Sequence, residues 1–434
     1  MTTLKAVRGT RDILPPETAL WNRIEAIARG VFARYNFGEI RTPVFEDTAL
    51  FARGVGEETD IVSKEMYTWE DRARAQSEKT QSLTLRPENT AGVVRAYIEH
   101  QLGETGQLQK LYYIGPQFRR ERPQKGRYRQ FSQIGAEVIG PPSSGSESPV
   151  RDAEVLEMLA TLLDELGIAG WTLELNSVGS AADRARYNDT LRAALVPVVG
   201  QMCADCQRRA VTNPLRVLDC KVPADQPIIA TLPVIADSLD EGSKTHFDAV
   251  LAALDTAGVP YTRNHRLVRG LDYYTRTTFE FTHGGLGAQN ALLGGGRYDG
   301  LSEAIGGPKA PGIGFAMGED RLVLTLLAQE LNQKATPPQG ADAFIAPLGE
   351  GLSSAGLALA RELRHTGLSI ELGGGSFRLK KSFEVANKTA RHIVILGEDE
   401  LQSGILTVKT FATGIQTKVP RAELAVFLSE PAGE

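Results

Sequence analysis

The sequence contains no long apolar run. None approaches the roughly 18 residues that a membrane-spanning helix needs, although hydrophobic residues make up 42% of the chain. Residues 1–16 are polar and charged and lack the apolar core of a signal peptide. We therefore expect a cytoplasmic protein that does not enter a membrane.

Cysteine is also scarce, which fits a reducing compartment. The three cysteines are Cys203, Cys206 and Cys220, and the first two form a CxxC pair. A structural zinc site wants four ligands, and Cys220 supplies only a third. His246 could complete the set, but its spacing matches no standard zinc pattern. Our interpretation is that these are small thiols in a minor domain, and no protein-bound metal site is predicted.

An excess of positive charge is missing as well. The net charge is -5, which argues against a protein coated with positive charge for binding nucleic acid. A local basic surface is still compatible with this value, because phosphate binding depends on where charges cluster. The length of 434 residues exceeds one ordinary core, so two or three domains are expected.

Hydrophobic periodicity predicts the main elements of the first part of the chain. Apolar residues at helical spacing predict an amphipathic helix over 19–33. Residues 107–119 and 128–140 indicate two strands joined by a basic turn, which is a hairpin with a long loop. Further strands are expected over 39–45 and 272–281.

The same patterns predict the domain organisation. Residues 1–175 and 263–331 are expected to form one domain, interrupted by a mainly helical insertion over 176–262. Residues 332–340 have the composition of a linker. From 341 to 434 strands and helices alternate in a β-α-β-α-β order, which predicts a separate small α/β domain.

The most informative segment runs from Phe118 to Phe131. Six cations lie between residues 119 and 129, against the single acid Glu121. Arginine forks grip phosphate oxygens, and their charge is fixed at physiological pH. An aromatic ring such as Phe131 can stack on a base. The segment indicates a nucleotide triphosphate site, with a solvated basic hairpin as the alternative.

A second segment, Leu267 to Thr275, contains the run RGLDYY. Gly270 allows a close backbone approach. Tyr273 and Tyr274 are expected to face opposite sides of a strand, so that one lines a pocket while the other packs in the core. An ordinary aromatic strand is the alternative. A third segment, Gly314 to Arg321, places glycines before a helix whose first turn carries two acids and an arginine that could reach a phosphate.

Three further polar residues indicate a pocket. Glu88 precedes an expected helix and is either a capping acid or an acceptor for a substrate ammonium group. Gln133 and Glu137 lie four residues apart on a strand, and they share the face of Phe131. Because a buried glutamate needs a partner, we expect Glu137 to face a cation or an N–H donor.

Together these segments resemble the histidyl-tRNA synthetases among the class II aminoacyl-tRNA synthetases. The pattern F-R-x-E, a loop, then R-x-x-x-F over 118–131 fits motif 2 of that class, and Gly312 to Arg321 resembles motif 3. The first helix with Pro43 resembles motif 1. RGLDYY at 269–274 is similar to the histidine-specific signature of the family, and LGGGRYDG at 293–300 is similar to its second signature. The resemblance covers nearly the whole chain.

The resemblance implies a fold and an activity. The fold would be of the α/β (α+β) class: an antiparallel sheet flanked by helices, with a helical insertion and a C-terminal α/β anticodon-binding domain. The enzyme would activate L-histidine with ATP, supplied with Mg2+, to form histidyl-adenylate. It would then transfer histidine from the adenylate to the 3′ end of histidine tRNA. Motif 1 would form a homodimer. Such a reaction requires no protein nucleophile, which agrees with the lack of a Ser-His-Asp pattern.

The resemblance also implies roles in ATP binding. Arg119 would hold the α-phosphate and the carboxylate region of histidine. Glu121 would contact the adenine amino group, and Phe131 would stack on the adenine ring. Arg127 and Arg321 would hold the β- and γ-phosphates.

For histidine, the resemblance makes Arg269 a catalytic cation on the α-phosphate, in the role that a metal ion has in related enzymes. The remaining residues would bind histidine: Glu88, Thr90 and Gln133 its amino group, and Glu137, Tyr273, Tyr274 and Tyr298 its imidazole side. Two residues depart from the family pattern, because Asn89 stands where glycine is common and Ser132 where histidine is common.

Two other functions compete with this one. The first is a catalytically silent paralogue, the regulatory subunit of an ATP phosphoribosyltransferase. That paralogue lacks the anticodon-binding domain and degrades the signatures, whereas both are present here. The second is a tRNA-binding or sensor module without catalysis. The cations of the C-terminal domain suit either function, and a solvated helix face is their alternative: Arg378, Lys380, Lys381, Lys388 and Arg391.

Overall fold

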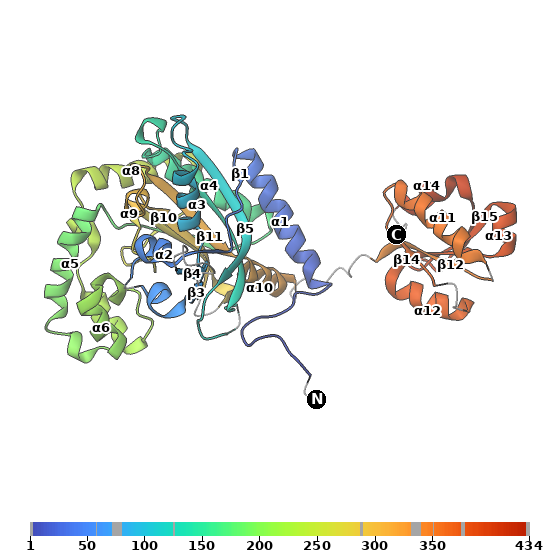
Figure 1. Ribbon diagram of the computed structural model, residues 1–434, viewed down its shortest axis with the longest axis horizontal. Helices are drawn as coiled ribbons and strands as arrows, with labels where there is room; N and C mark the ends of the chain where they lie inside the picture. Colours follow the sequence, from blue (N-terminus) through green and yellow to red (C-terminus); the bar gives the residue numbers. More distant parts are fainter. Residues whose placement is uncertain are drawn as a thin grey trace. The chain divides into compact units, whose positions relative to one another are not determined.

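The computed structural model forms two compact units, Met1–Lys334 and Ala335–Glu434 (Figure 1). The residues that it describes are 3–57, 59–71, 80–124, 126–286, 290–330, 340–349, 351–374 and 378–430. Apart from Gly340, the linker expected over 332–340 lies outside these residues.

The first unit is built on an eight-stranded sheet. Its inner strands all run antiparallel to their neighbours, and only the two short edge strands pair in parallel. The antiparallel sheet expected from the sequence is therefore confirmed. Across the sheet the strands are β1 (Gly38–Glu39), β5 (Gln109–Phe118), β6 (Gln130–Ile139), β11 (Gly312–Gly318), β10 (Ala291–Arg297), β9 (Thr275–His283), β7 (Trp171–Ser177) and β8 (Thr262–Arg263).

Four helices cover one face of this sheet and form the main core with it. The predicted first helix is confirmed, since α1 spans Glu17–Arg34 and buries Ile24, Ala28 and Val31 at three- to four-residue spacing. Burial of these side chains removes apolar surface from water, which is the main stabilising contribution. The other helices are α4 (Pro149–Glu165), α8 (Glu241–Ala257) and α10 (Glu319–Glu330).

The opposite face of the sheet carries the candidate site. Side chains alternate along β6, so that Ala136 and Val138 pack in the main core while Ile139 packs on the opposite face. Glu137 shares that opposite face, where it meets the first turn of α3. The elements on this side are α2 (Thr48–Val55), α3 (Thr90–Glu99), α9 (Leu301–Ala304), the π-helix η1 (Ile61–Glu65), and a small sheet of β2 (Phe45–Asp47), β4 (Gln81–Leu85) and β3 (Tyr67–Asp71).

The single strand predicted over 39–45 is wrong. Its two ends belong to different sheets, because β1 ends at Glu39 in the large sheet and β2 begins at Phe45 in the small one. The buried guanidinium of Arg86 donates from Nη1 to the carbonyl oxygens of Thr42 and Pro43, at 3.0 and 3.3 Å. These carbonyls are satisfied by a side chain instead of a neighbouring strand.

Helices fill most of the range where an insertion is expected. A separate small core joins α5 (Ala181–Leu195), α6 (Ala204–Thr212) and α7 (Gln226–Thr231), and Figure 1 shows α5 and α6 together, away from α1. In contrast, α8 packs in the core of the large sheet. The boundaries 176–262 stay a prediction. Short 3-10 helices in the first unit are η2 (Pro142–Ser144), η3 (Val199–Gln201), η4 (Pro214–Val217), η5 (Pro223–Asp225), η6 (Ile235–Ser238) and η7 (Gly284–Leu286).

The second unit has a five-stranded sheet with helices on both faces. The expected β-α-β-α-β alternation corresponds to β12 (Ala341–Pro347), α11 (Leu352–His365), β13 (Ile370–Leu372), α12 (Leu379–Thr389) and β14 (Ala390–Leu396). Two further antiparallel strands, which were not predicted from the sequence, extend the sheet beyond β14. The later elements are α13 (Glu398–Ser403), β15 (Ile405–Thr410), β16 (Gln416–Pro420), η8 (Arg421–Glu423) and α14 (Leu424–Ser429).

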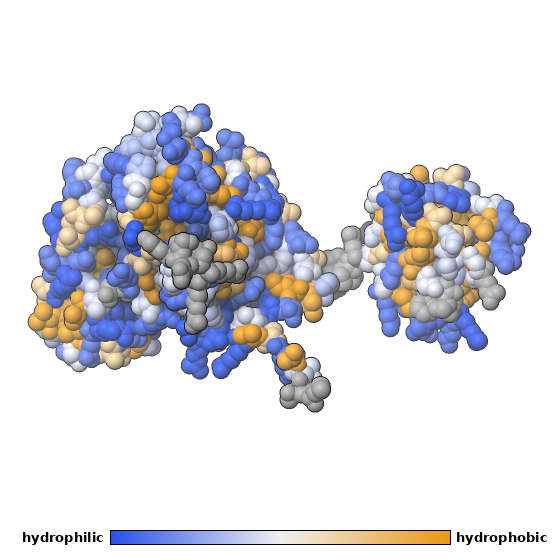
Figure 2. Space-filling model, viewed as in Figure 1, coloured by the Kyte–Doolittle hydropathy of each residue, from blue (hydrophilic) through white to orange (hydrophobic). Residues whose placement is uncertain are grey.

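Within the described part of the chain, no helix is both long and apolar enough to cross a membrane. On the visible face of each unit, hydrophobic residues form small patches among hydrophilic ones (Figure 2).

Candidate active site

A cavity of about 1240 Å³ opens between the motif 2 hairpin, the RGLDYY segment and the start of α10. Seven residues singled out in the sequence line it: Arg119, Glu121, Arg127, Phe131, Gln133, Arg269 and Arg321. Four of these seven are arginines, so the part of the cavity that these residues line is suited to an anionic group such as a polyphosphate.

The hairpin holds Arg119 at the edge of this cavity. β5 and β6 pair up to Phe118 and Gln130, and the backbone N–H of Arg119 donates to the carbonyl of Arg129 at 2.9 Å. Its side-chain Nε donates to the carbonyl of Pro87 at 2.8 Å. The guanidinium carbon lies 5.3 Å from the centre of the Phe131 ring, within the range of a cation–π contact. The sequence thus brings a fixed cation and a base-sized ring side by side.

Two more arginines are held by different partners. Nη1 of Arg127 donates to Oε2 of Glu121 at 3.2 Å. Nη1 of Arg321 donates to the carbonyl of Ala291 at 2.5 Å. Burial lowers the pKa of Arg321, and the nearby positive charges of Arg127 and Arg269 lower it further. Clustered like charges of this kind are relieved when an anion binds between them.

Arg269 forms an ion pair with Glu280 on β9. Burial disfavours the charge of Arg269, but the carboxylate of Glu280 opposes this effect and the pKa of Arg269 is raised overall. Glu280 was not among the site residues predicted from the sequence. Strand alternation alone could not show that its side chain meets an arginine from a distant loop.

Consecutive glycines on β10 make room for this arrangement. A Cβ atom at Gly294 would lie 2.4 Å from Nη2 of Arg269. At Gly295 it would lie 2.1 Å from the carbonyl oxygen of Gly314, and at Gly296 it would lie 2.8 Å from Cδ1 of Tyr274. Real Cβ atoms do not come this close to other atoms, so the GGG run keeps space for Arg269, for β11 and for Tyr274.

The other predicted histidine-binding residues form a second, buried group that does not line the cavity. Its members are Glu88, Thr90, Glu137, Tyr273, Tyr274 and Tyr298. The structure brings these six together beside β6. Gln133, on the same face of β6 as Glu137, connects them to the cavity.

Glu88 caps the first turn of α3. Its Oε2 accepts a hydrogen bond from the backbone N–H of Thr90 at 2.8 Å, and Oε1 accepts one from Ala91 at 3.0 Å. This confirms the capping interpretation. Burial raises the pKa of Glu88. The role as an acceptor for a substrate ammonium group stays a prediction.

Glu137 is completely buried. Burial raises the pKa of Glu137 to about 8. The sequence predicted a cation or an N–H donor opposite it, but its partner is a hydroxyl: Oγ1 of Thr90 donates to Oε1 at 2.7 Å. Within the described residues, Oε2 of Glu137 and Oε1 of Gln133 accept no hydrogen bond. Two unsatisfied acceptors on one face suit a ligand that brings its own N–H groups.

The prediction that Tyr273 and Tyr274 face opposite sides of a strand is wrong. β9 begins only at Thr275, so both tyrosines lie in the turn before it and strand alternation does not apply. Their ring centres are 4.7 Å apart, and the ring of Tyr298 lies 6.0 Å from that of Tyr273 with edge-to-face geometry. All three rings belong to one buried cluster.

A buried ion network supports the strands behind the site. Arg297 is completely buried, and its Nε donates to Oδ1 of Asp152 at 2.8 Å. Nε2 of His246 lies 2.9 Å from Oδ2 of the same carboxylate. His246 therefore has a partner away from the cysteines. Cys203, Cys206 and Cys220 instead gather with Asp225 in the helical insertion.

Comparison with known proteins gives a consistent result. The family described as Histidyl-tRNA synthetase matches residues 9–322. The chain belongs to this family. The family described as Anticodon binding domain matches residues 342–430, within the second unit.

The relatives cover the chain almost completely. A Histidine--tRNA ligase from Koribacter versatilis (strain Ellin345) is 71% identical over 98% of this chain and 96% of the relative. The apo histidyl-tRNA synthetase of S. aureus is 38% identical, with a TM-score of 0.79, over 99% of this chain and 100% of that structure. A structure from Bacillus halodurans, titled an ATP phosphoribosyltransferase regulatory subunit/histidyl-tRNA synthetase, is 20% identical with a TM-score of 0.64 over 92% of this chain and 99% of that one. This last likeness shows the fold alone.

The two departures from the family pattern have local explanations. Asn89 is buried, and its Oδ1 accepts hydrogen bonds from Oγ1 of Thr42 at 2.6 Å and from Nη1 of Arg86 at 3.3 Å. Ser132 lies beside Glu319, a buried carboxyl whose pKa burial raises to about 8. The serine hydroxyl opposes this rise, but it brings no positive charge.

Proposed function

We propose that this protein is an enzyme that activates L-histidine with ATP and transfers it to the 3′ end of histidine tRNA. The observation that carries the proposal is the identity of 71% to a Histidine--tRNA ligase over 98% of the chain. The cavity supports it, because adenylation needs a site for a triphosphate and four of the arginines singled out from the sequence line this cavity.

We propose that ATP lies along the motif 2 hairpin. Phe131 would stack on adenine, and Glu121 would accept a hydrogen bond from the adenine amino group. In the present structure Glu121 holds Arg127, so binding would separate this pair and free Arg127 for the terminal phosphates. Arg321 would hold the same phosphates from the start of α10.

Adenylation would proceed through charge stabilisation. A carboxylate oxygen of histidine attacks the α-phosphorus, the new O–P bond forms, and the bond to the β-phosphate oxygen breaks. Pyrophosphate leaves with the electron pair. Negative charge on the α-phosphate oxygens is stabilised by Arg119 and Arg269, which are already held in place by Pro87 and Glu280. No protein nucleophile takes part.

Magnesium would enter bound to the phosphates of ATP. The carboxylates of Glu121 and Glu280 border the cavity, but each is paired with an arginine. Arg127 and Arg321 would hold the leaving pyrophosphate, and magnesium supplied with ATP would add further positive charge there.

The buried polar group beside β6 would select histidine. Imidazole carries an N–H group, and the unsatisfied Oε2 of Glu137 is an acceptor for it. A side chain without such a donor would leave this acceptor unpaired, which costs binding energy. Glu88, Thr90 and Gln133 would contact the amino group of histidine, for which Oε1 of Gln133 is an unsatisfied acceptor. The tyrosines would close the pocket.

The second unit would bind the anticodon. Three exposed cations on and before α12 form no ion pair among the described residues: Arg378, Lys380 and Lys388. By contrast, Lys381 pairs with Glu384, and Arg391 pairs with Asp342 at 2.5 Å. The unpaired cations are the better candidates for phosphate contacts with tRNA.

We also propose a homodimer. Phe45 and Trp69 are 52% and 40% exposed on the small sheet, with ring centres 6.0 Å apart. Val44 next to them is 38% exposed. An apolar surface of this kind is typical of an interface, and it adjoins Pro43 of motif 1. A cytoplasmic location would fit its role in protein synthesis and its three free thiols.

The test is ATP–pyrophosphate exchange with the purified protein and each amino acid in turn. Exchange should depend on histidine and fall by about 100-fold or more in Arg269→Ala. Arg192→Ala, on the exposed face of α5, is the matched control and should keep its activity. Charging of histidine tRNA then tests the second step.

The same experiment separates the regulatory paralogue. Its fold is shared, so fold does not decide between the two. A folded protein that binds ATP but gives no histidine-dependent exchange would refute the ligase proposal and favour the regulatory subunit.

A further inference from the structure

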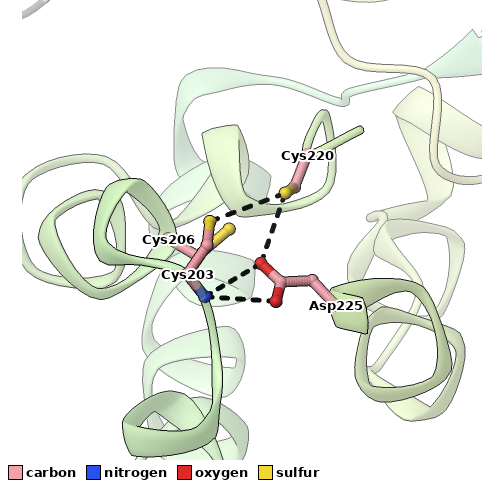
Figure 3. Close-up of side chains that lie close together, drawn as sticks. All are labelled: Cys203, Cys206, Cys220 and Asp225. Carbon is pink, nitrogen blue, oxygen red and sulfur yellow. Dashed lines mark hydrogen bonds between the residues drawn. The ribbon is translucent and has the colours of Figure 1, made fainter. Parts of the chain in front are cut away.

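Three cysteines and an aspartate converge within the helical insertion (Figure 3). Cys203 precedes α6, Cys206 lies in its first turn, Cys220 follows η4, and Asp225 ends η5. Their Sγ atoms and one carboxylate oxygen all lie within 4.8 Å of one another. Four ligand atoms from three separate turns thus surround one point.

The spacing of these atoms fits a tetrahedral ion. With Zn–S bonds of about 2.3 Å, two sulfur ligands of a tetrahedral zinc lie about 3.8 Å apart. The Sγ atoms of Cys203 and Cys220 are 3.9 Å apart. Sγ of Cys220 lies 3.3 Å from Oδ2 of Asp225. A disulfide would need the sulfurs about 2.0 Å apart, and all three cysteines are free.

Asp225 is the one acidic member of this cluster. Its side chain is 1% exposed. It accepts hydrogen bonds from the backbone N–H of Cys203 at 3.1 and 3.2 Å and from the thiol of Cys220. Among the described residues it forms no ion pair with a lysine, arginine or histidine. A buried carboxylate without a cation is costly, so a bound cation would stabilise this arrangement.

We propose that Cys203, Cys206, Cys220 and Asp225 bind a structural zinc ion. Thiolates select soft or borderline cations over Mg2+ and Ca2+, which prefer oxygen ligands. Four protein ligands leave no open position for a substrate, which is typical of a structural site. His246, the fourth ligand considered from the sequence, is held by Asp152 instead.

Burial raises the pKa of the Cys206 and Cys220 thiols, and two local features oppose this effect. The CxxC pair lies at the N-terminus of α6, whose backbone N–H groups stabilise negative charge. The backbone N–H of Val222 donates to Sγ of Cys220 at 3.4 Å. Such outer hydrogen bonds orient metal ligands and offset their charge. Zinc would replace the thiol protons, which pass to solvent.

The ion would fix one wall of the active-site cavity. Cys203 and Cys220 border the same cavity as Arg269. In the chain, η4 lies between the CxxC pair and Cys220. Its Arg216 lies close to the RGLDYY segment, because a Cβ atom added at Gly270 would be 3.4 Å from Nη1 of Arg216. By joining both ends of this stretch, zinc would hold η4 against the segment that carries Arg269.

The test is metal content of the full chain, purified under reducing conditions and dialysed against a weak chelator. We expect about one zinc per chain by elemental analysis. Replacement by Co2+ should give the visible absorption bands of a tetrahedral ion with thiolate ligands. The zinc content of each of the variants Cys203→Ser, Cys220→Ser and Asp225→Asn should be at least about tenfold lower than that of the unmodified protein.

Asp205→Asn is the matched control. Asp205 lies between the two cysteines of the CxxC pair, but its side chain is 63% exposed and pairs with Arg208. This variant should keep its zinc. Circular dichroism shows whether each variant is folded. If a variant does not fold, the cobalt spectrum of the unmodified protein still tests the proposal.

Three outcomes would overturn the proposal. The first is unmodified protein, produced with added zinc, that holds none and gives no thiolate–cobalt bands. The second is full zinc content in a Cys203→Ser, Cys220→Ser double variant, which would place the ion elsewhere. The third is a mass two hydrogens lower under reducing conditions, which would show a disulfide at the cluster.

Discussion

Gly294 on β10 lies directly against the guanidinium of Arg269. A Cβ atom at position 294 would be 2.4 Å from Nη2 and 2.5 Å from Cζ of Arg269. Arg269 also pairs with Glu280, the residue directly opposite Gly294 on the neighbouring strand β9. The position of Arg269, the proposed catalytic cation, therefore depends on the carboxylate of Glu280 and on the lack of a side chain at Gly294.

Gly294→Ala should displace Arg269 and lower kcat/KM for ATP–pyrophosphate exchange by about 100-fold, since a positioned charge on the transferring phosphate has an effect of this size. Gly300→Ala is the matched control, because a Cβ there meets nothing within 4 Å. Thermal unfolding of both variants separates a local shift from misfolding. Unchanged exchange in a folded Gly294→Ala protein would contradict the role of Arg269.

Glu137→Gln should weaken histidine selection more than ATP binding. Above about pH 8 Glu137 is ionised and offers two acceptor oxygens. The amide keeps the size of the side chain but replaces one of them by a donor, so at pH 9 an imidazole N–H loses its partner. We expect the KM for histidine to rise about 10- to 100-fold, while the KM for ATP changes about twofold or less. Steady-state exchange over both substrates measures this, with the exposed Glu303→Gln as control. Equal changes in both KM values would argue against an imidazole site at Glu137.

Asp152→Asn should destabilise the first unit. Arg297 and Asp152 are both completely buried, and His246 shares the same carboxylate. Among the described residues, removing the negative charge leaves buried Arg297 with the partly exposed Asp299 as its one acidic partner. The free energy of unfolding in urea should fall by about 3 kcal/mol. Asp189→Asn, which breaks an exposed ion pair with Arg192, should change it by about 0.5 kcal/mol or less.

Glu319→Gln should stabilise the protein at high pH. Burial raises the pKa of Glu319 from 4.5 to about 8. Between pH 4.5 and about pH 8 the Glu319 carboxyl is ionised in the unfolded chain but protonated in the folded protein. The free energy of unfolding therefore falls as pH rises. This loss of stability is complete above about pH 8 and absent below pH 4.5.

The glutamine variant lacks this titration. Its stability should match that of the unmodified protein at pH 4.5 and exceed it at pH 8, by on the order of a few kcal/mol. Urea unfolding at both pH values measures the difference, with Glu303→Gln as the exposed control. A constant difference between the two pH values would show that Glu319 does not titrate in this range.

Periodicity in the sequence predicted the elements that bury one continuous face. The helix over 19–33 and the hairpin strands over 107–140 are present close to their predicted bounds. Prediction failed where long-range contacts override local pattern. The stretch 39–45 is divided between two sheets because Arg86, more than forty residues away, binds its carbonyl groups.

For the candidate site, the sequence identified the arginines of the cavity through motifs with fixed spacing. It did not identify Glu280, whose only local signal is its place on a strand. It also treated Tyr273 and Tyr274 as strand residues, although a turn places both rings in one cluster. The fourth member of the cysteine cluster, Asp225, lies on a different turn from the cysteines, so spacing gave no hint of it.

The sequence by itself determined the family of this protein, its class of fold and the residue types at its candidate site. These follow from motifs and from the periods of helix and strand, which act over a few residues. Only the tertiary structure decided which carboxylate faces Arg269, which glycine makes room for it, and which aspartate joins the cysteines. Such pairs are set by the packing of segments that are distant in the sequence, because each buried charge needs an oppositely charged or hydrogen-bonding partner.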